Sequence, residues 1–279
     1  MQGLIKRAWR IGTAIVLCSG LFLILGGAAN GFQRADITSH SACQAGADSR
    51  DDLSATARAN PLSPPGREGE PVDVDLGLHM EYLNSISEAD HAFTLEAFVE
   101  LIWCDPRLAY DPAATGETRR IYLEDVAVRK IGEIWWPDLY FVNQAGPPVI
   151  ERQELIIFPD GTVVHEERVR VTLKARLDLT KFPFDRQKLE IEIESFAWPS
   201  HEMVLHLDTD KIGLATVFNT PPWQVVSHHA EIRNMREIRD RDEFSEFVME
   251  VETARISMPF VYRLLIPLIL VVMASWSVF

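Results

Sequence analysis

The sequence predicts an all-β fold, an antiparallel β-sandwich over residues 71 to 256, followed by one transmembrane helix over residues 257 to 279. Two observations lead to this prediction. In several runs of the first region, apolar and polar residues alternate, which is typical of strands with one buried face. In the second region, residues 260 to 279 are apolar except for Arg263 and a few hydroxyls, and this is about the length that crosses a hydrocarbon core.

The first 29 residues are typical of a secretory signal peptide. An apolar run over residues 11 to 25 follows the cations Lys6, Arg7 and Arg10 and precedes the small residues 26 to 29. An uncleaved membrane anchor is the alternative, because the run is long for a signal peptide. Residues 30 to 70 are rich in Ala, Ser, Asp, Gly and Pro and predict a disordered linker.

Composition and net charge exclude several classes of function. The formal net charge of −14 argues against a nucleic-acid partner and fits a cationic ligand or simple solubility. Three cysteines, Cys18, Cys43 and Cys104, are odd in number and widely separated, so we expect neither a disulfide framework nor a metal site, and we interpret Cys104 as a buried thiol. No catalytic or cofactor motif occurs in the sequence, so we expect a protein that is not an enzyme and that has no cofactor and no metal.

Two strands open the predicted sandwich. Residues 72 to 78 alternate, and after a turn at residues 88 to 91 the run from Phe93 to Trp103 has one continuous apolar face. Phe98 is a lone aromatic residue on the polar face of this second strand, which makes it either a ligand contact or a cross-strand packing residue.

Two hairpins are predicted further along the chain. Asp160-Gly161 favours a tight turn. In the strand that follows, we expect a mostly solvated edge, with contact of one of its side chains to a ligand as the alternative; this edge consists of His165, Glu166, Glu167, Arg168 and Arg170. Strands at residues 223 to 229 and 244 to 253 form the second hairpin, whose charged tip would be residues 234 to 243.

An aromatic turn joins two alternating strands in the middle of the chain. Before the turn, Val169, Val171 and Leu173 alternate with polar residues; after it, Leu189, Ile191 and Ile193 alternate with Lys188, Glu190, Glu192 and Glu194. Pro183, between Phe182 and Phe184, cannot continue a ladder because proline lacks the N–H donor, and a cis bond is plausible there.

The spacing of Asp178, Phe182, Pro183, Phe184, Asp185, Gln187 and Ser195 resembles the signature loop of the pentameric ligand-gated ion channels, the Cys-loop receptor superfamily. In animal members two cysteines bracket this loop. Ala175 and Leu189 stand at those positions, which is the pattern of the bacterial members. Further motifs resemble the same family: Trp103 to Leu108, Trp135 to Asp138, and the first membrane helix with Arg255 before it and Pro267 within it.

This resemblance implies an immunoglobulin-like sandwich of about ten strands that serves as an extracellular or periplasmic ligand-binding domain in the cell membrane. Five copies would form a homo-pentamer and bind a small molecule, such as an amine, between neighbours. The principal side would contribute Phe196, His201, Phe244 and Phe247, and the complementary side Phe98. Val142 stands where animal receptors have a site aromatic, so the aromatic cage is not carried over intact.

The resemblance also implies a coupling region, in which the turn Phe182, Pro183, Phe184 and Asp185 presses on the membrane helices and Asp185 forms a partly buried pair with Arg255. The family's pore helix would follow residue 279, where the sequence stops, so a pore-less membrane-tethered or shed binding protein is an alternative function. A carbohydrate-binding or adhesive β-sandwich is a third, and it would need a carboxylate pair in a cleft.

Overall fold

The computed structural model describes residue 43 and residues 53–67, 69–215, 219–236 and 242–276. The predicted signal peptide and the centre of the last hairpin's tip lie outside these residues. The chain divides into two compact units, residues 1–39 and 40–279, and every described residue belongs to the second. Its helices are α1 (Ala55–Ala59), a 3₁₀ turn (Pro106–Leu108), α2 (Pro112–Thr115), α3 (Asp125–Ile131) and α4 (Met258–Trp276). Its strands are β1 (Val72–Ser87), β2 (Ala92–Cys104), β3 (Arg120–Leu123), β4 (Leu139–Phe141), β5 (Val149–Ile157), β6 (Thr162–Lys174), β7 (Arg186–Ser195), β8 (Met203–Leu207), β9 (Gly213–Leu214), β10 (Asn219–Thr220), β11 (Trp223–Arg236) and β12 (Glu243–Arg255).

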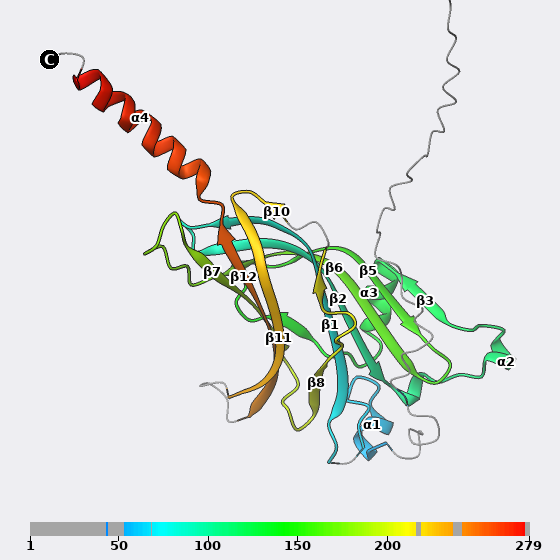
Figure 1. Cartoon of the computed structure of the whole chain (residues 1–279). Helices are drawn as coiled ribbons and strands as arrows, with labels where there is room; N and C mark the ends of the chain where they lie inside the picture. Colours follow the sequence, from blue (N-terminus) through cyan, green and yellow to red (C-terminus); the bar gives the residue numbers. More distant parts are fainter. Residues whose placement is uncertain (1–42, 44–52, 68, 216–218, 237–241, 277–279) are drawn as a thin grey trace, which may run out of the picture. The chain divides into compact units, whose positions relative to one another are not determined.

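These strands form two sheets, as the sequence predicts (Figure 1). A seven-stranded sheet has the order β3-β5-β6-β2-β1-β8, with β9 also paired to β1. A five-stranded sheet has the order β10-β11-β12-β7-β4. The two predicted hairpins are present as β5–β6, which turns at Gly161, and β11–β12.

The sandwich is not antiparallel throughout. β8 and β9 both pair with β1 in the parallel direction. The reason is that β7 belongs to the five-stranded sheet and β8 to the other, so the segment between them crosses the sandwich and does not form a hairpin. The described residues also form twelve strands where about ten were expected.

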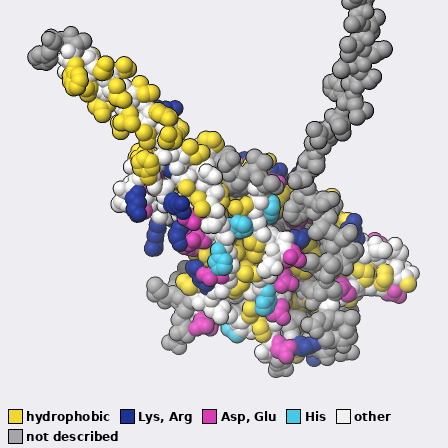
Figure 2. Space-filling model, in the orientation of Figure 1, with side chains coloured by type: hydrophobic (Ala, Val, Ile, Leu, Met, Phe, Trp, Pro, Cys, Tyr) yellow, Lys and Arg dark blue, Asp and Glu magenta, His cyan; other side chains and the backbone are white. Residues whose placement is uncertain are grey.

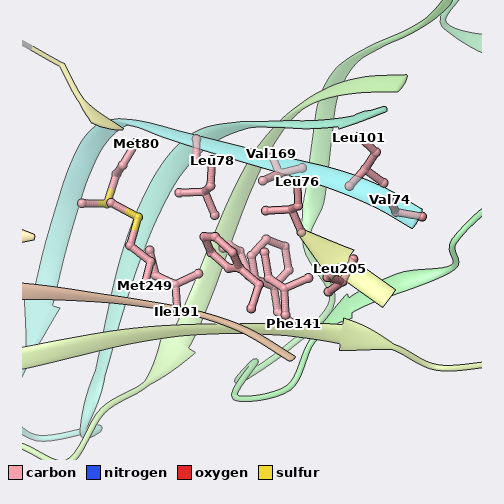
Figure 3. Packing of buried hydrophobic residues seen from close by; sticks show 14 of the residues in the cluster. Val74, Leu76, Leu78, Met80, Leu101, Phe141, Val169, Ile191, Leu205 and Met249 are labelled. Atoms are coloured by element: carbon pink, nitrogen blue, oxygen red, sulfur yellow. The ribbon is translucent and has the colours of Figure 1, made fainter. Parts of the chain in front are cut away.

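The core lies between the two sheets and follows from the alternation of each strand. Leu76, Leu78 and Met80 point inward from β1, and Ile191 and Met249 face them from β7 and β12 (Figure 3). These side chains are at most 1% exposed. Successive residues of a strand point to opposite faces, so the same alternation leaves Glu190, Glu192 and Glu194 on the other side of β7.

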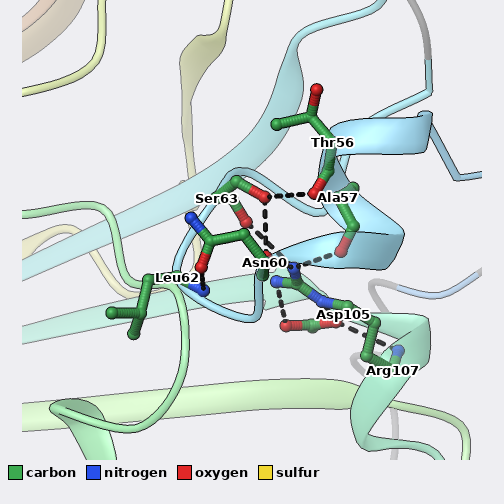
Figure 4. A network of polar contacts seen from close by, with 7 residues as sticks. All are labelled: Thr56, Ala57, Asn60, Leu62, Ser63, Asp105 and Arg107. Carbon is green, nitrogen blue, oxygen red and sulfur yellow. Dashed lines mark hydrogen bonds and ion pairs between the residues drawn. The ribbon is translucent and has the colours of Figure 1, made fainter.

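The predicted disordered linker is wrong for its second half. Ser54 caps α1 by accepting a hydrogen bond from the backbone N–H of Ala57, and Arg107 donates to the carbonyl oxygens of Ala57, Asn60 and Ser63 at 3.0 to 3.1 Å (Figure 4). Arg107 itself is held by Asp105 through two bonds of 2.8 Å. The ion pair of Asp105 and Arg107 is therefore largely buried, because a segment of the linker covers it.

A disulfide joins Cys43 to Cys104. The prediction of a free buried thiol at Cys104 is therefore wrong. The two cysteines are 61 residues apart in sequence, and the partner lies in a polar stretch without regular spacing, so no sequence pattern pairs them. The bond fastens the N-terminal segment to the end of β2.

α4 follows β12 after two residues. In the described part of the chain it is the one helix long and apolar enough to cross a membrane, with a mean hydropathy of 2.0. Its side chains are not buried within this chain, and Figure 2 shows hydrophobic groups covering most of the visible side of the helix. The C-terminal transmembrane helix expected from the sequence is confirmed in position and type.

Candidate ligand-binding site

A turn after β7 carries the most exposed aromatic side chain among the predicted ligand contacts. Ser195 donates from its hydroxyl to the carbonyl of Pro137 at 2.7 Å, and the backbone N–H of Phe196 donates to the carbonyl of Asp138 at 3.0 Å. Asp138 has a positive φ of 51°, which turns the chain at this contact. The turn is thus fixed by its backbone, while the ring of Phe196 is left 69% exposed.

Tyr140 connects this aromatic residue to a buried carboxylate. Its ring packs edge-on against Phe196, with centroids 5.9 Å apart. Its hydroxyl donates to Glu194 Oε1 at 2.5 Å. Tyr140 belongs to β4 and Glu194 to β7, which pair in register, so the hydrogen bond joins directly opposed residues.

A second carboxylate lies opposite the first. Glu246 of β12 is the cross-strand partner of Glu194, and the two residues are only 5% and 4% exposed. Burial, followed by the negative charges of Glu192 and Glu194, raises the pKa of Glu246 to about 7. Glu192, next along the same face, also has a raised pKa because of burial and the charge of Glu190.

The arrangement is an acidic, partly desolvated surface with aromatic rings at one end. Like charges that face each other across strands destabilise a sheet, and each raises the pKa of the other. Arg233 of β11 is opposed to Glu246 and lowers its pKa, but not enough to cancel the effect of burial, and in the described part of the chain no lysine or arginine nitrogen lies within ion-pair distance of Glu246. A small cation placed here would relieve the repulsion and could also contact the faces of Phe196 and Tyr140.

The second feature of interest is at the other end of β12, where the predicted pair of Asp185 and Arg255 is confirmed. Arg255 Nε donates to Asp185 Oδ1 at 2.7 Å and its terminal nitrogen to Oδ2 at 3.0 Å. Both side chains are only 1% exposed, so the pair is more deeply buried than expected. Burial by itself would raise the pKa of Asp185, but the hydrogen bonds from Arg255 and Gln187 outweigh it and hold that pKa below its ordinary value.

Arg255 also links the aromatic turn to the start of α4. Its guanidinium lies 4.0 Å from the ring centroid of Trp223, 4.9 Å from that of Phe182 and 5.5 Å from that of Phe260. Phe182 packs edge-on against Phe260 of α4, with centroids 5.3 Å apart. The Phe182–Pro183 peptide bond is cis, as the sequence had suggested. Phe184 lies in the same turn and is 66% exposed.

Comparison with known proteins decides the family. Residues 53–256 match the model of the neurotransmitter-gated ion-channel ligand-binding domain. The chain belongs to this family. It is a family of ligand-gated ion channels, which is not a class of enzymes.

Individual relatives agree with the family. The chain is 27% identical over 217 residues to a proton-gated ion channel of Gloeobacter violaceus, an alignment that covers 77% of this chain and 58% of that protein. It is 25% identical over 223 residues to a gamma-aminobutyric acid receptor subunit beta of Lymnaea stagnalis, covering 77% and 44%. It is 31% identical over 146 residues to the receptor subunit rho-3 of Rattus norvegicus, covering 51% and 30%. The chain therefore spans less than two thirds of the length of these relatives.

Within this ligand-binding domain, the sequence-predicted contacts fall into separate places. Phe196 and Phe244 lie on the face of the five-stranded sheet that carries Glu194 and Glu246, which we call the carboxylate face. Phe244 is two residues before Glu246 on β12, and it is 9% exposed. His201 is exposed beside the start of β12, where the N–H of Ser200 donates to the carbonyl of Glu243 at 2.7 Å. Phe247 is fully buried in the core and faces the other way, so the expectation that it closes over a ligand is not supported by its position.

Phe98 lies on the outer face of the other sheet. Arg168 is 5.8 Å from its ring centroid, and Glu96, two residues away on β2, accepts hydrogen bonds from Arg168 and Arg170. One chain therefore does not bring Phe98 and Phe196 together.

Sequence reasoning missed Tyr140, Glu194 and Glu246. The alternation of its strand places Glu194 on the polar face but does not indicate that it is buried. Its burial depends on the register of β7 with β4 and β12, which no local pattern specifies. The prediction for His165 is wrong as well: it is 1% exposed and lies inside the sandwich, not on a solvated edge.

Proposed function

We propose that the chain is the ligand-binding part of a ligand-gated ion channel subunit and that its ligand is a small ammonium compound. The ammonium group would lie between Glu194 and Glu246 and against the rings of Phe196 and Tyr140. The observation that carries the proposal is the directly opposed pair of buried carboxylates, in which the pKa of Glu246 is raised although Arg233 lies across from it on β11. A bound cation would stabilise the ionised form of both.

In this proposal five copies form a homo-pentamer in the cell membrane, with the domain on the extracellular or periplasmic side. Phe98 and the charged residues around it lie on the sheet opposite to the carboxylate face, so they are suited to meet the Phe196 face of a neighbouring copy. His201 and Phe244 would border the ligand at the start of β12.

Ligand binding would reach the membrane helices along β12, which carries Glu246 near one end and Arg255 at the other. The Arg255–Asp185 pair and the Phe182–Phe260 contact join that strand and the aromatic turn to α4. A ligand shifts such an equilibrium only as far as its affinity differs between the two arrangements.

The test is binding of propylammonium to the purified full chain in nanodiscs, followed by calorimetry, with 1-propanol as the uncharged comparison. Loss of one charge-assisted hydrogen bond costs about 1.5–3 kcal/mol. Glu194→Gln and Glu246→Gln are therefore each expected to weaken binding by about 10- to 100-fold.

Glu250→Gln is the matched control. Glu250 lies on the same face of β12 and pairs with Lys188 at 2.9 Å, so its removal should leave affinity unchanged within a factor of about two. If propanol binds as tightly as propylammonium, or if all three variants behave alike, the proposed site is wrong.

A further inference from the structure

A cavity lies between the two sheets, on the opposite side of β7 from Glu194. It has a volume of about 210 Å³. Leu101, Phe141, Val169 and Ile193 are part of its apolar lining, to which the aromatic residues Trp136 and Tyr140 also contribute. Figure 3 shows Phe141 projecting between the two sheets, near Leu101 and Val169.

Two polar side chains of β6 interrupt this apolar lining. On β6, Val163, Val169 and Val171 point inward as the alternation requires, but His165 and Glu167 occupy inward positions of the same series. Both line the cavity. Interior positions are rarely given to ionisable groups unless these are paired or serve a ligand.

One ring nitrogen of His165, a residue that lines the cavity, has no hydrogen-bond partner among the described residues. Its side chain is 2% exposed, and Nε2 is buried and forms no hydrogen bond within the described residues. The nearest charged atom is Glu167 Oε1 at 3.4 Å, and the ring packs edge-on to Trp136, with centroids 6.1 Å apart. Burial lowers the pKa of His165 to about 4, so the imidazole is neutral near pH 7 and Nε2 can accept a hydrogen bond.

Glu167 has no cationic partner either. In the described part of the chain no lysine or arginine nitrogen lies within ion-pair distance of it, and the adjacent Arg168 points out of the sandwich to Glu81, Glu96 and Glu151. Burial raises the pKa of Glu167 to about 7. When ionised, this carboxylate can only accept hydrogen bonds.

These features define the ligand that would satisfy them. His165 Nε2 and the Glu167 carboxylate are adjacent acceptors, one neutral and one anionic, and a positively charged donor group would satisfy both. The aromatic and aliphatic lining calls for an apolar body. An apolar cavity of about 150 Å³ holds benzene, so a single six-membered ring with a short substituent is the size that fits here.

We propose that this cavity is a second binding site, which takes a small cyclic amine whose ammonium group donates hydrogen bonds to Glu167 and to His165 Nε2. Tyr140 borders both this cavity and the site proposed above, but the carboxylates of the two sites lie on opposite sides of β7, because Ile193 lines the cavity while its neighbour Glu194 faces the other way. A ligand here would contact both sheets at once, through β2 and β6 on one side and β4 and β7 on the other.

The experiment uses 4-fluorobenzylamine as the probe and ¹⁹F NMR as the readout, with the full chain in nanodiscs. The key variant is Glu167→Gln, which keeps the shape and removes the charge, and we expect at least 10-fold weaker binding. Glu166→Gln is the matched control: the side chain of Glu166 points to the opposite face of β6, so this variant should bind the probe as the unchanged protein does.

Val99→Phe places a larger side chain in the same cavity and should abolish binding. Thermal unfolding of each variant verifies that it is folded.

Further measurements separate the two proposed sites. Glu246→Gln should leave the cavity's binding of 4-fluorobenzylamine unchanged. If only Glu246→Gln weakens binding, the cavity proposal is overturned while the proposed function stands. If 4-fluorobenzyl alcohol or 4-fluorotoluene binds as tightly as the amine, recognition of an ammonium group is overturned. If no probe binds at millimolar concentration, the cavity holds only water and the inference fails.

Discussion

Asp185 and Glu246 are both buried carboxylates of one sheet, but their surroundings differ. Asp185 accepts hydrogen bonds from Arg255 and Gln187, and these hold its pKa below the ordinary value in spite of burial. Glu246 faces a second glutamate, and its pKa is raised to about 7. The first is next to the start of α4, and the second is near the opposite end of β12.

The difference in their charged neighbours gives the two buried carboxylates different effects on stability. At Asp185 the protein supplies the opposite charge itself, so removing either partner leaves an uncompensated ion and weakens the fold. At Glu246 the opposed Arg233 offsets burial and the neighbouring glutamates only in part, so the ionised form is a cost to the fold that a bound cation would reduce. Substitutions at the two places should therefore change stability in opposite directions.

The largest effect is expected for Asp185→Asn. It leaves the guanidinium of Arg255 buried without its ionic partner, and breaking a buried pair in this way costs about 3–5 kcal/mol. The free energy of unfolding, measured by urea denaturation of the full chain in detergent, should fall by that amount. A loss below about 1 kcal/mol would mean that Glu88, which also accepts from Arg255 at 2.7 Å, is a sufficient partner.

Arg255→Lys should have a smaller effect of the same sign. Lysine keeps the charge but cannot form the two parallel bonds to Asp185 and reach Glu88 at the same time. The loss should be about 1.5–3 kcal/mol in the same denaturation experiment. Stability equal to that of the unchanged protein would show that the charge of Arg255 matters and its geometry does not.

Glu246→Gln should increase the free energy of unfolding at high pH, in contrast to the two substitutions above. A carboxyl group whose pKa rises from 4.5 to about 7 on folding contributes stability below pH 4.5, and this is lost as the pH rises through 7. The variant should gain about 0.5–2 kcal/mol in the free energy of unfolding over the unchanged protein at pH 8 and nothing at pH 4.

The contribution of Asp185 to stability has the opposite pH dependence, because its pKa is lowered on folding. It is present above the ordinary pKa of 3.8 and is lost as the pH falls below it. Thermal unfolding across pH 3 to 9 would reveal both trends, and a destabilised Glu246→Gln at pH 8 would contradict the comparison.

The smallest effect is expected for Arg186→Gln. Arg186 pairs with Glu252 at 3.1 Å on the same sheet, one residue from Asp185, but its side chain is 64% exposed. Water screens such a pair, so its loss should cost about 0–1 kcal/mol. A cost comparable to that of Asp185→Asn would show that burial does not explain the difference between the two regions.

The sequence predicts what depends on neighbours along the chain. The alternation of β2 and β7, the turn at Asp160-Gly161 and the apolar length of α4 each follow from a short stretch, and the structure has all of them. The pairing of Asp185 with Arg255, 70 residues apart, was predicted only through the family resemblance.

What depends on register or on distant segments was not predictable. Glu194 and Glu246 meet because β7 and β12 pair in one of several registers that the same polar alternation would allow. His165 has the same place in the alternation as Val163 and Val171, but the charged residues around it favour a solvated edge, and its burial depends on the position of the second sheet. The bond of Cys43 to Cys104 likewise depends on where a polar segment packs.

That disulfide has a consequence for the direction in which the chain crosses the membrane. Disulfides form and persist in oxidising compartments and are rare in the cytosol. The sandwich that carries the Cys43–Cys104 bond is followed at once by α4, so we expect Met258 to lie at the oxidising surface of the bilayer and Trp276 toward the reducing one. The compartment that we infer from this bond thus predicts the orientation of a helix that begins 154 residues after Cys104.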